Sequence, residues 1–89
     1  MSAKQAIANA IAGHASTSYT AWRIGLTHDL AERKAYWASQ ESVVSWHAWE
    51  CDSLSDAQEI ESHFINKRKM KGGTGGDLSA RKTVYVYIF

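Results

Sequence analysis

The chain has 89 residues, of which 45% are hydrophobic and 21% charged, and its formal net charge is +1. This length and composition fit one small folded domain and exclude a predominantly disordered chain, while the near-zero charge excludes a uniformly basic nucleic-acid binder. The single cysteine, Cys51, excludes an internal disulfide. The sequence has no long apolar run, so we expect no membrane partner and no signal peptide, and hence a cytoplasmic protein.

The first half of the chain predicts a helix, a strand and a second helix. Apolar residues recur at helical spacing over residues 3–12, and Gly13 is a typical helix stop. After a polar linker, side chains alternate over residues 19–27 as in a strand. Asp29, followed by a glutamate three residues later, resembles a capping box that opens a helix to about Ala38.

The second half predicts a strand, a helix, a loop and a final strand. β-Branched and aromatic residues fill 43–51, and Ser53 begins a helix that we expect to run to about Lys69. Residues 71–77 form a glycine-rich loop, and residues 82–89 alternate as a strand. The predicted fold is therefore α+β: a small three-stranded antiparallel sheet with helices packed on it, in the order α-β-α-β-α-β.

Arg33 breaks the apolar pattern of its helix. It shares one face with Leu30 and Trp37, because the three residues are spaced at i, i+3 and i+7. A guanidinium on that face is costly unless it is paired or faces a ligand. The alternative is that its stem packs on the core while its head reaches solvent.

Glu61 stands at the rim of another apolar stripe, between Ile60 and Phe64. Carboxylates are rarely buried without a partner, so one interpretation is a structural ion pair. The other is a metal ligand, since one carboxylate with open water positions suits Mg²⁺.

A basic cluster lies at the end of the predicted third helix. It consists of Lys67, Arg68, Lys69 and Lys71 and leads into the glycine-rich loop. Cations beside accessible backbone N–H groups favour phosphate contacts, but cations at a helix C-terminus also suit the helix dipole. Both interpretations stay open.

Two runs of the sequence resemble the GIY-YIG nuclease family. Residues 22–33, which read Trp-Arg-Ile-Gly-Leu-Thr-His-Asp-Leu-Ala-Glu-Arg, are similar to the family's second strand and first helix. Residues 53–65 resemble its second helix. The resemblance places Arg33 at the family's helix arginine and Glu61 at its metal-binding glutamate. It implies a GIY-YIG-like core over residues 15–89, of the small phage or bacterial type, preceded by an N-terminal helix over residues 1–14.

The chain departs from the family's tyrosine motifs. The first triplet, glycine-isoleucine-tyrosine, is not found before residue 19, and Arg23 replaces the tyrosine of the second triplet. Tyr19, Tyr85 and Tyr87 are the candidates to replace a missing tyrosine. Tyr85 and Tyr87 belong to the last strand, which is itself the candidate for the place of the missing first strand.

The resemblance supports the hypothesis of a nucleic-acid-binding, nuclease-like domain. As a hydrolase it would hold Mg²⁺ at Glu61, neutralise a phosphate with Arg33 and place Tyr19 near the attacking water. Arg23 and the basic cluster would contact the nucleic acid, which we expect to be DNA. We expect Arg33 and Glu61 to converge on one cleft with Arg23 and a tyrosine. The added charge of Arg23 favours an anion there over a metal.

The alternative is a non-catalytic interaction module of a phage or mobile element, which uses the same fold to contact nucleic acid or a host protein. Loss of both motif tyrosines favours this alternative, and retention of Arg33 and Glu61 favours the nuclease. Large aromatic side chains would supply the contact area of such a module, with Trp46, Trp49, Tyr85 and Tyr87 as candidates.

Overall fold

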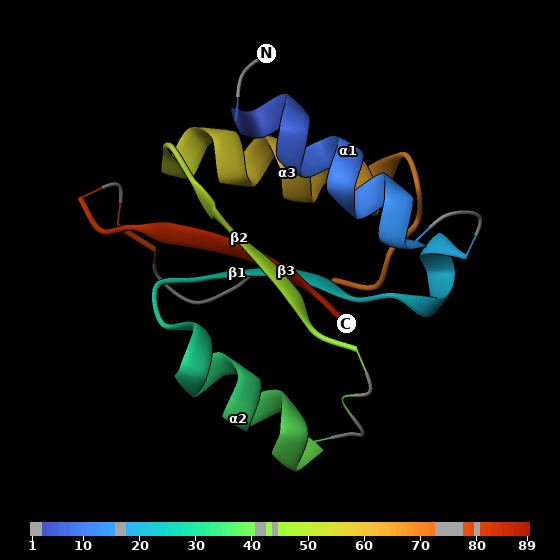
Figure 1. Ribbon diagram of the computed structural model, residues 1–89, viewed down its shortest axis with the longest axis horizontal. Coiled ribbons are helices and arrows are strands. Elements are labelled where there is room, and N and C mark those ends of the chain that lie inside the picture. The colour runs from blue at the N-terminus through green and yellow to red at the C-terminus, as the bar shows by residue number, and fades with distance from the viewer. Residues whose placement is uncertain (1–2, 16–17, 41–42, 44, 73–77, 80) are drawn as a thin grey trace.

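The computed structural model, which describes residues 3–15, 18–40, 43, 45–72, 78–79 and 81–89, has the expected α+β fold. Its helices and strands follow the predicted order α-β-α-β-α-β, with a short 3-10 helix before the first strand. In chain order they are α1 (Ala3–Ala15), η1 (Tyr19–Ala21), β1 (Ile24–Thr27), α2 (Leu30–Gln40), β2 (His47–Cys51), α3 (Leu54–Asn66) and β3 (Val84–Ile88). Helices α1 and α3 cover one face of the sheet, and α2 lies on the other (Figure 1).

The last strand occupies the centre of the sheet. The strand order is β1-β3-β2, and β3 is antiparallel to both neighbours. Ile88 is opposite Ile24 on one side and His47 on the other. Because β3 is paired on both edges and helices flank the sheet, four of its five residues are buried.

The main core lies between the sheet and the pair α1 and α3. The predicted alternation of β3 is confirmed, because its aliphatic side chains enter this core. Helix α1 contributes to the same core as α3. The fully buried side chains with the largest volumes are Phe64, Ile11, Ile24, Ile88, Val84 and Val86.

Helix α2 covers the opposite face with few apolar side chains. No α2 residue is fully buried, and only Leu30, Arg33 and Trp37 are partly buried. The shared face that the spacing of these three residues predicts is therefore confirmed. An arginine thus lies on the side of α2 that faces the sheet.

The first two predicted boundaries were wrong. Helix α1 does not stop at Gly13 but continues to Ala15, which is only 2% exposed because it packs in the core. Residues 19–21 are not strand: they form η1, where the N–H of Trp22 donates to the carbonyl of Tyr19. The ring of Tyr19 stacks on Phe64, and this tertiary contact replaces the strand pairing that alternation predicted.

Two later boundaries were also wrong. Strand β2 begins at His47 rather than at residue 43, since the ladder with β3 starts at the pair His47–Ile88. Helix α3 ends at Asn66 rather than near Lys69. Lys69 has a left-handed backbone (φ 63°), and the N–H of Met70 donates to the carbonyl of Phe64. The chain turns there because Met70, 3% exposed, enters the core.

The predicted glycine-rich loop is described only at its first two residues, and residues 73–77 lie outside the described part of the chain. Lys71 forms a parallel bridge with Arg23, and its backbone exchanges hydrogen bonds with Trp22 and Ile24. This segment therefore covers the outer edge of β1.

Candidate nucleic-acid interface

Tyr87 is the central residue of the α2 side of the sheet. Its side chain crosses Gly25 on the neighbouring strand, and a Cβ at Gly25 would overlap the Tyr87 hydroxyl. The indole Nε1–H of Trp37 donates to that hydroxyl over 2.9 Å. Tyr87 is 4% exposed, and this burial is the main cause that raises the pKa of its phenol. The hydroxyl is therefore protonated at neutral pH.

Other aromatic rings hold Tyr87 in place. Trp46, just before β2, stacks on it with 4.8 Å between ring centroids and 12° between planes. Phe89 lies 5.6 Å from Trp46 and 5.4 Å from Trp37. The phenol thus sits in a cluster of packed rings, which fixes the direction of its hydroxyl.

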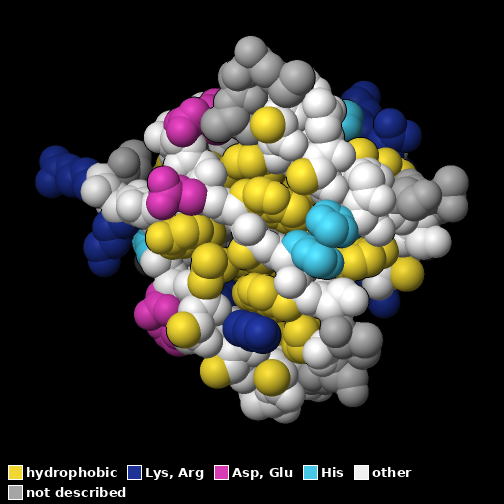
Figure 2. Space-filling view, viewed as in Figure 1, with side chains coloured by type: hydrophobic (Ala, Val, Ile, Leu, Met, Phe, Trp, Pro, Cys, Tyr) yellow, Lys and Arg dark blue, Asp and Glu magenta, His cyan; other side chains and the backbone are white. Residues whose placement is uncertain are grey.

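Two guanidinium groups border this cluster. That of Arg23 lies 4.4 Å above the ring of Trp37, and that of Arg33 lies 5.1 Å above the ring of Tyr36. Both charges lower the pKa of Tyr87 against the larger effect of burial. In Figure 2, basic side-chain atoms lie among hydrophobic ones on the α2 side of the sheet. Both arginines therefore act on the same phenol.

The charge of Glu61, on α3, also affects Tyr87. Its carboxylate raises the pKa of Tyr87, while partial burial raises the pKa of Glu61 itself. One oxygen, Oε2, is buried and has no hydrogen-bond partner among the described residues. An unsatisfied buried oxygen costs free energy unless a ligand or proton satisfies it.

Arg23 and Arg33 thus lie over rings on the α2 side of the sheet, and Glu61 is related to Tyr87 only through its effect on the pKa of the phenol. Tyr19, the tyrosine expected near the attacking water, lies elsewhere: its ring is 6.0 Å from Phe64 and carries the guanidinium of Arg68 at 5.2 Å. The tyrosine of this site is Tyr87, which the sequence offered only as one of three candidates. Gly25, which lies beneath the Tyr87 ring, was the sequence feature that could have distinguished Tyr87 from the other candidates.

The basic cluster lies beyond the C-terminal end of α3. Lys67, Arg68, Lys69 and Lys71 are all exposed. The backbone of Lys71 is bridged to that of Arg23, so this one residue of the cluster lies beside Arg23.

A second group of rings connects α1 to β2 on the core side of the sheet. His14 and His47 stack with 3.7 Å between centroids and 19° between planes, and Figure 2 shows histidine side chains side by side. Trp49 lies 5.9 Å from His14 and 6.3 Å from His47. Burial, and secondarily the charge of His14, lower the pKa of His47.

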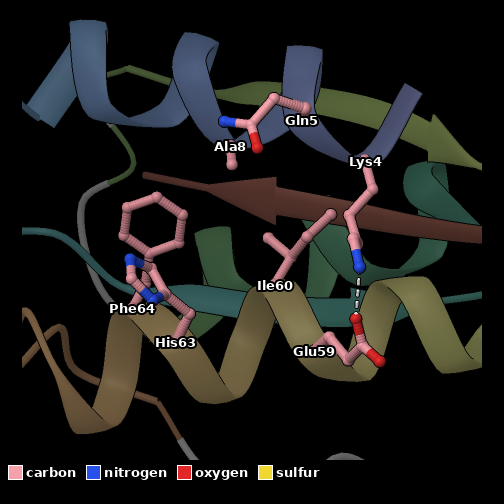
Figure 3. Close-up of a pocket in the computed structure, with 7 residues that line it drawn as sticks. All are labelled: Lys4, Gln5, Ala8, Glu59, Ile60, His63 and Phe64. Carbon is pink, nitrogen blue, oxygen red and sulfur yellow. Dashed lines mark hydrogen bonds and ion pairs between the residues drawn. The ribbon is translucent and has the colours of Figure 1, made fainter. Parts of the chain in front are cut away.

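A pocket of about 270 Å³ lies between α1 and α3 (Figure 3). Lys4 of α1 reaches across it to form an ion pair with Glu59 of α3. Its remaining lining residues are Gln5, Ala8, Ile60, His63 and Phe64. None of the site residues predicted from the sequence lines this pocket.

Within the described residues, no three His, Cys, Asp or Glu side chains gather as a metal site. In the same part of the chain, no helix is both long and apolar enough to cross a membrane. Comparison with protein-family models, curated proteins and solved structures finds no match. The geometry around Tyr87 is therefore the basis for a functional assignment.

Proposed function

We propose that this chain is a nucleic-acid-binding, nuclease-like domain whose phosphate site surrounds the Tyr87 hydroxyl. One observation carries the proposal: this hydroxyl accepts from Trp37, and that bond does not use its own O–H, which can donate to the oxygen of a phosphate that reaches it. The raised pKa keeps that proton on the oxygen. Tyr87 therefore serves as a hydrogen-bond donor, and a general base is not its role.

Arg23 and Arg33 supply the positive charge that a phosphodiester needs. Guanidinium groups bind phosphate oxygens through paired N–H donors, and both groups here are aligned over aromatic rings. The backbone bridge that sets Lys71 beside Arg23 supports a contact of the basic cluster with the same ligand. The proposal is therefore a track for a polyanion that ends at Tyr87.

Hydrolysis is a second candidate, and the free Oε2 of Glu61 favours it. With Mg²⁺ bound, Glu61 would hold the ion beside the phosphate, and the ion would supply an activated water. The raised pKa of Glu61 means that a proton competes for the same oxygen. The positive charges of Arg23 and Arg33, which act on Tyr87, would also repel a Mg²⁺ ion bound at this site. Phosphate binding is accordingly the primary proposal.

Binding is tested with fluorescein-labelled DNA and RNA by anisotropy over a range of salt concentrations. Arg33→Gln should lose affinity, whereas Lys34→Gln, the matched loss of charge on the exposed side of α2, should change it little. Wild-type protein without affinity at low salt would refute the proposal and favour the protein-interaction module. Equal losses of affinity in Arg33→Gln and Lys34→Gln would show that Arg33 is not part of the phosphate site.

Hydrolysis is tested on plasmid, single-stranded DNA and RNA, with Mg²⁺ and with EDTA. Glu61→Gln should abolish any Mg²⁺-dependent cleavage while nucleic-acid binding is retained. Glu59→Gln, on the same helix and exposed, is the matched control and should cleave like wild type. If wild-type protein bound nucleic acid without cleaving it, the proposed phosphate site would stand and the proposed hydrolase activity would be rejected.

A further inference from the structure

Tyr36 is the exposed large hydrophobic side chain of the described part of the chain, with 47% of its surface accessible. The other aromatic residues of the α2 side are packed against one another. Trp37 and Trp46 are partly buried, and Tyr87 is buried. An exposed aromatic ring beside a packed aromatic cluster has contact area left for a partner.

The ring of Tyr36 is held next to the proposed phosphate site. The Arg33 guanidinium lies 5.1 Å from its centroid, and Trp37 meets it edge-on with 5.1 Å between centroids and 82° between planes. Trp37 in turn donates to Tyr87. A phosphate on Arg33 therefore places the rest of its nucleotide beside the Tyr36 ring.

We infer that Tyr36 is a stacking platform for an unpaired nucleobase, so that the Tyr87 site prefers single-stranded nucleic acid. This inference rests on the proposed function and adds the class of ligand. A base in a duplex has both faces covered by its neighbours, whereas an unpaired base has a face free for an aromatic ring. Arg33 then holds the phosphate while Tyr36 holds the base.

The test compares Tyr36→Leu with Tyr36→Phe in anisotropy titrations of labelled oligo(dT), oligo(rU) and a dT·dA duplex. Stacking on one aromatic ring contributes about fivefold or more to affinity. We expect Tyr36→Leu to weaken single-strand binding at least about fivefold more than it weakens duplex binding, because the duplex loses only the ring that supports Arg33. Tyr36→Phe keeps the ring and should bind like wild type. Because Tyr36 is exposed, both variants should fold, which circular dichroism checks.

The duplex and phenylalanine titrations separate the inference from a simple loss of charge positioning. If Tyr36→Leu weakened duplex and single strand equally, Arg33 would have moved and the stacking role would be rejected. If Tyr36→Phe lost as much as Tyr36→Leu, the hydroxyl rather than the ring would be responsible. Wild-type binding that depends on Arg33 but not on Tyr36 would overturn only this inference. No wild-type binding at all would overturn the proposed function as well.

Discussion

Gly25→Ala should disrupt the Tyr87 site from beneath. A Cβ at this position would lie 2.5 Å from Tyr87 Cζ, whereas carbon atoms in contact are about 3.5–4.0 Å apart. The phenol would have to move by about 1 Å, which takes its hydroxyl out of hydrogen-bond range of Trp37. Overpacking costs about 1–3 kcal/mol and the lost hydrogen bond about 1 kcal/mol, so we expect about 2–4 kcal/mol of destabilisation.

Urea unfolding followed by tryptophan fluorescence measures this cost. In a Tyr87→Val background the ring is absent, and Gly25→Ala should then cost less than about 1 kcal/mol. Gly13→Ala is the matched glycine control. It has no atom within 4 Å of the added methyl and should stabilise α1 by about 0.5–1 kcal/mol. An equal cost of Gly25→Ala with and without Tyr87 would refute the steric argument.

Three further predictions concern charge. Burial raises the pKa of Glu61 in the folded state, so the stability that this carboxyl contributes at low pH is lost as the pH rises. Glu61→Gln should therefore raise the free energy of unfolding at about pH 8 but not at about pH 4. Urea unfolding at both pH values checks this. Because burial, and secondarily the charge of His14, lower the pKa of His47, its contribution to stability is full above its ordinary pKa and is lost as the pH falls through its folded pKa. His47→Gln should remove that acid loss and His14→Gln should reduce it only in part, as thermal melts across this range will show. Charge reversal at Lys69 or Lys71 should weaken binding of all sequences alike and reduce the slope of log affinity against log salt by about 1 per residue. A slope unchanged by both reversals would exclude the basic cluster from the interface.

The shared face of α2 and the alternation of β3 could be predicted because both are local. Leu30, Arg33 and Trp37 are brought to one side by helical spacing alone. The same reasoning identified the unusual position of Arg33. Local periodicity, however, does not say which element a face will meet.

What could not be predicted depends on contacts between distant segments. Stacking of Tyr19 on Phe64 converts a predicted strand into η1, and burial of Met70 ends α3 early. The hydrogen bond from Trp37 to Tyr87 joins residues fifty positions apart. The selection of Tyr87 and the role of Trp37 therefore follow from tertiary packing, which a single sequence does not reveal.

The central claim is that nucleic acid binds at the Tyr87 hydroxyl, and the Trp37 indole N–H that donates to it is a direct reporter. The measurement is a ¹H–¹⁵N titration of the four tryptophan indoles with oligo(dT), with each signal assigned from a Trp→Phe variant. A phosphate on Tyr87 should shift the Trp37 signal strongly and saturably, while Trp49, on the core side of β2, stays in place. A Trp37 signal that does not move while binding saturates would contradict the account.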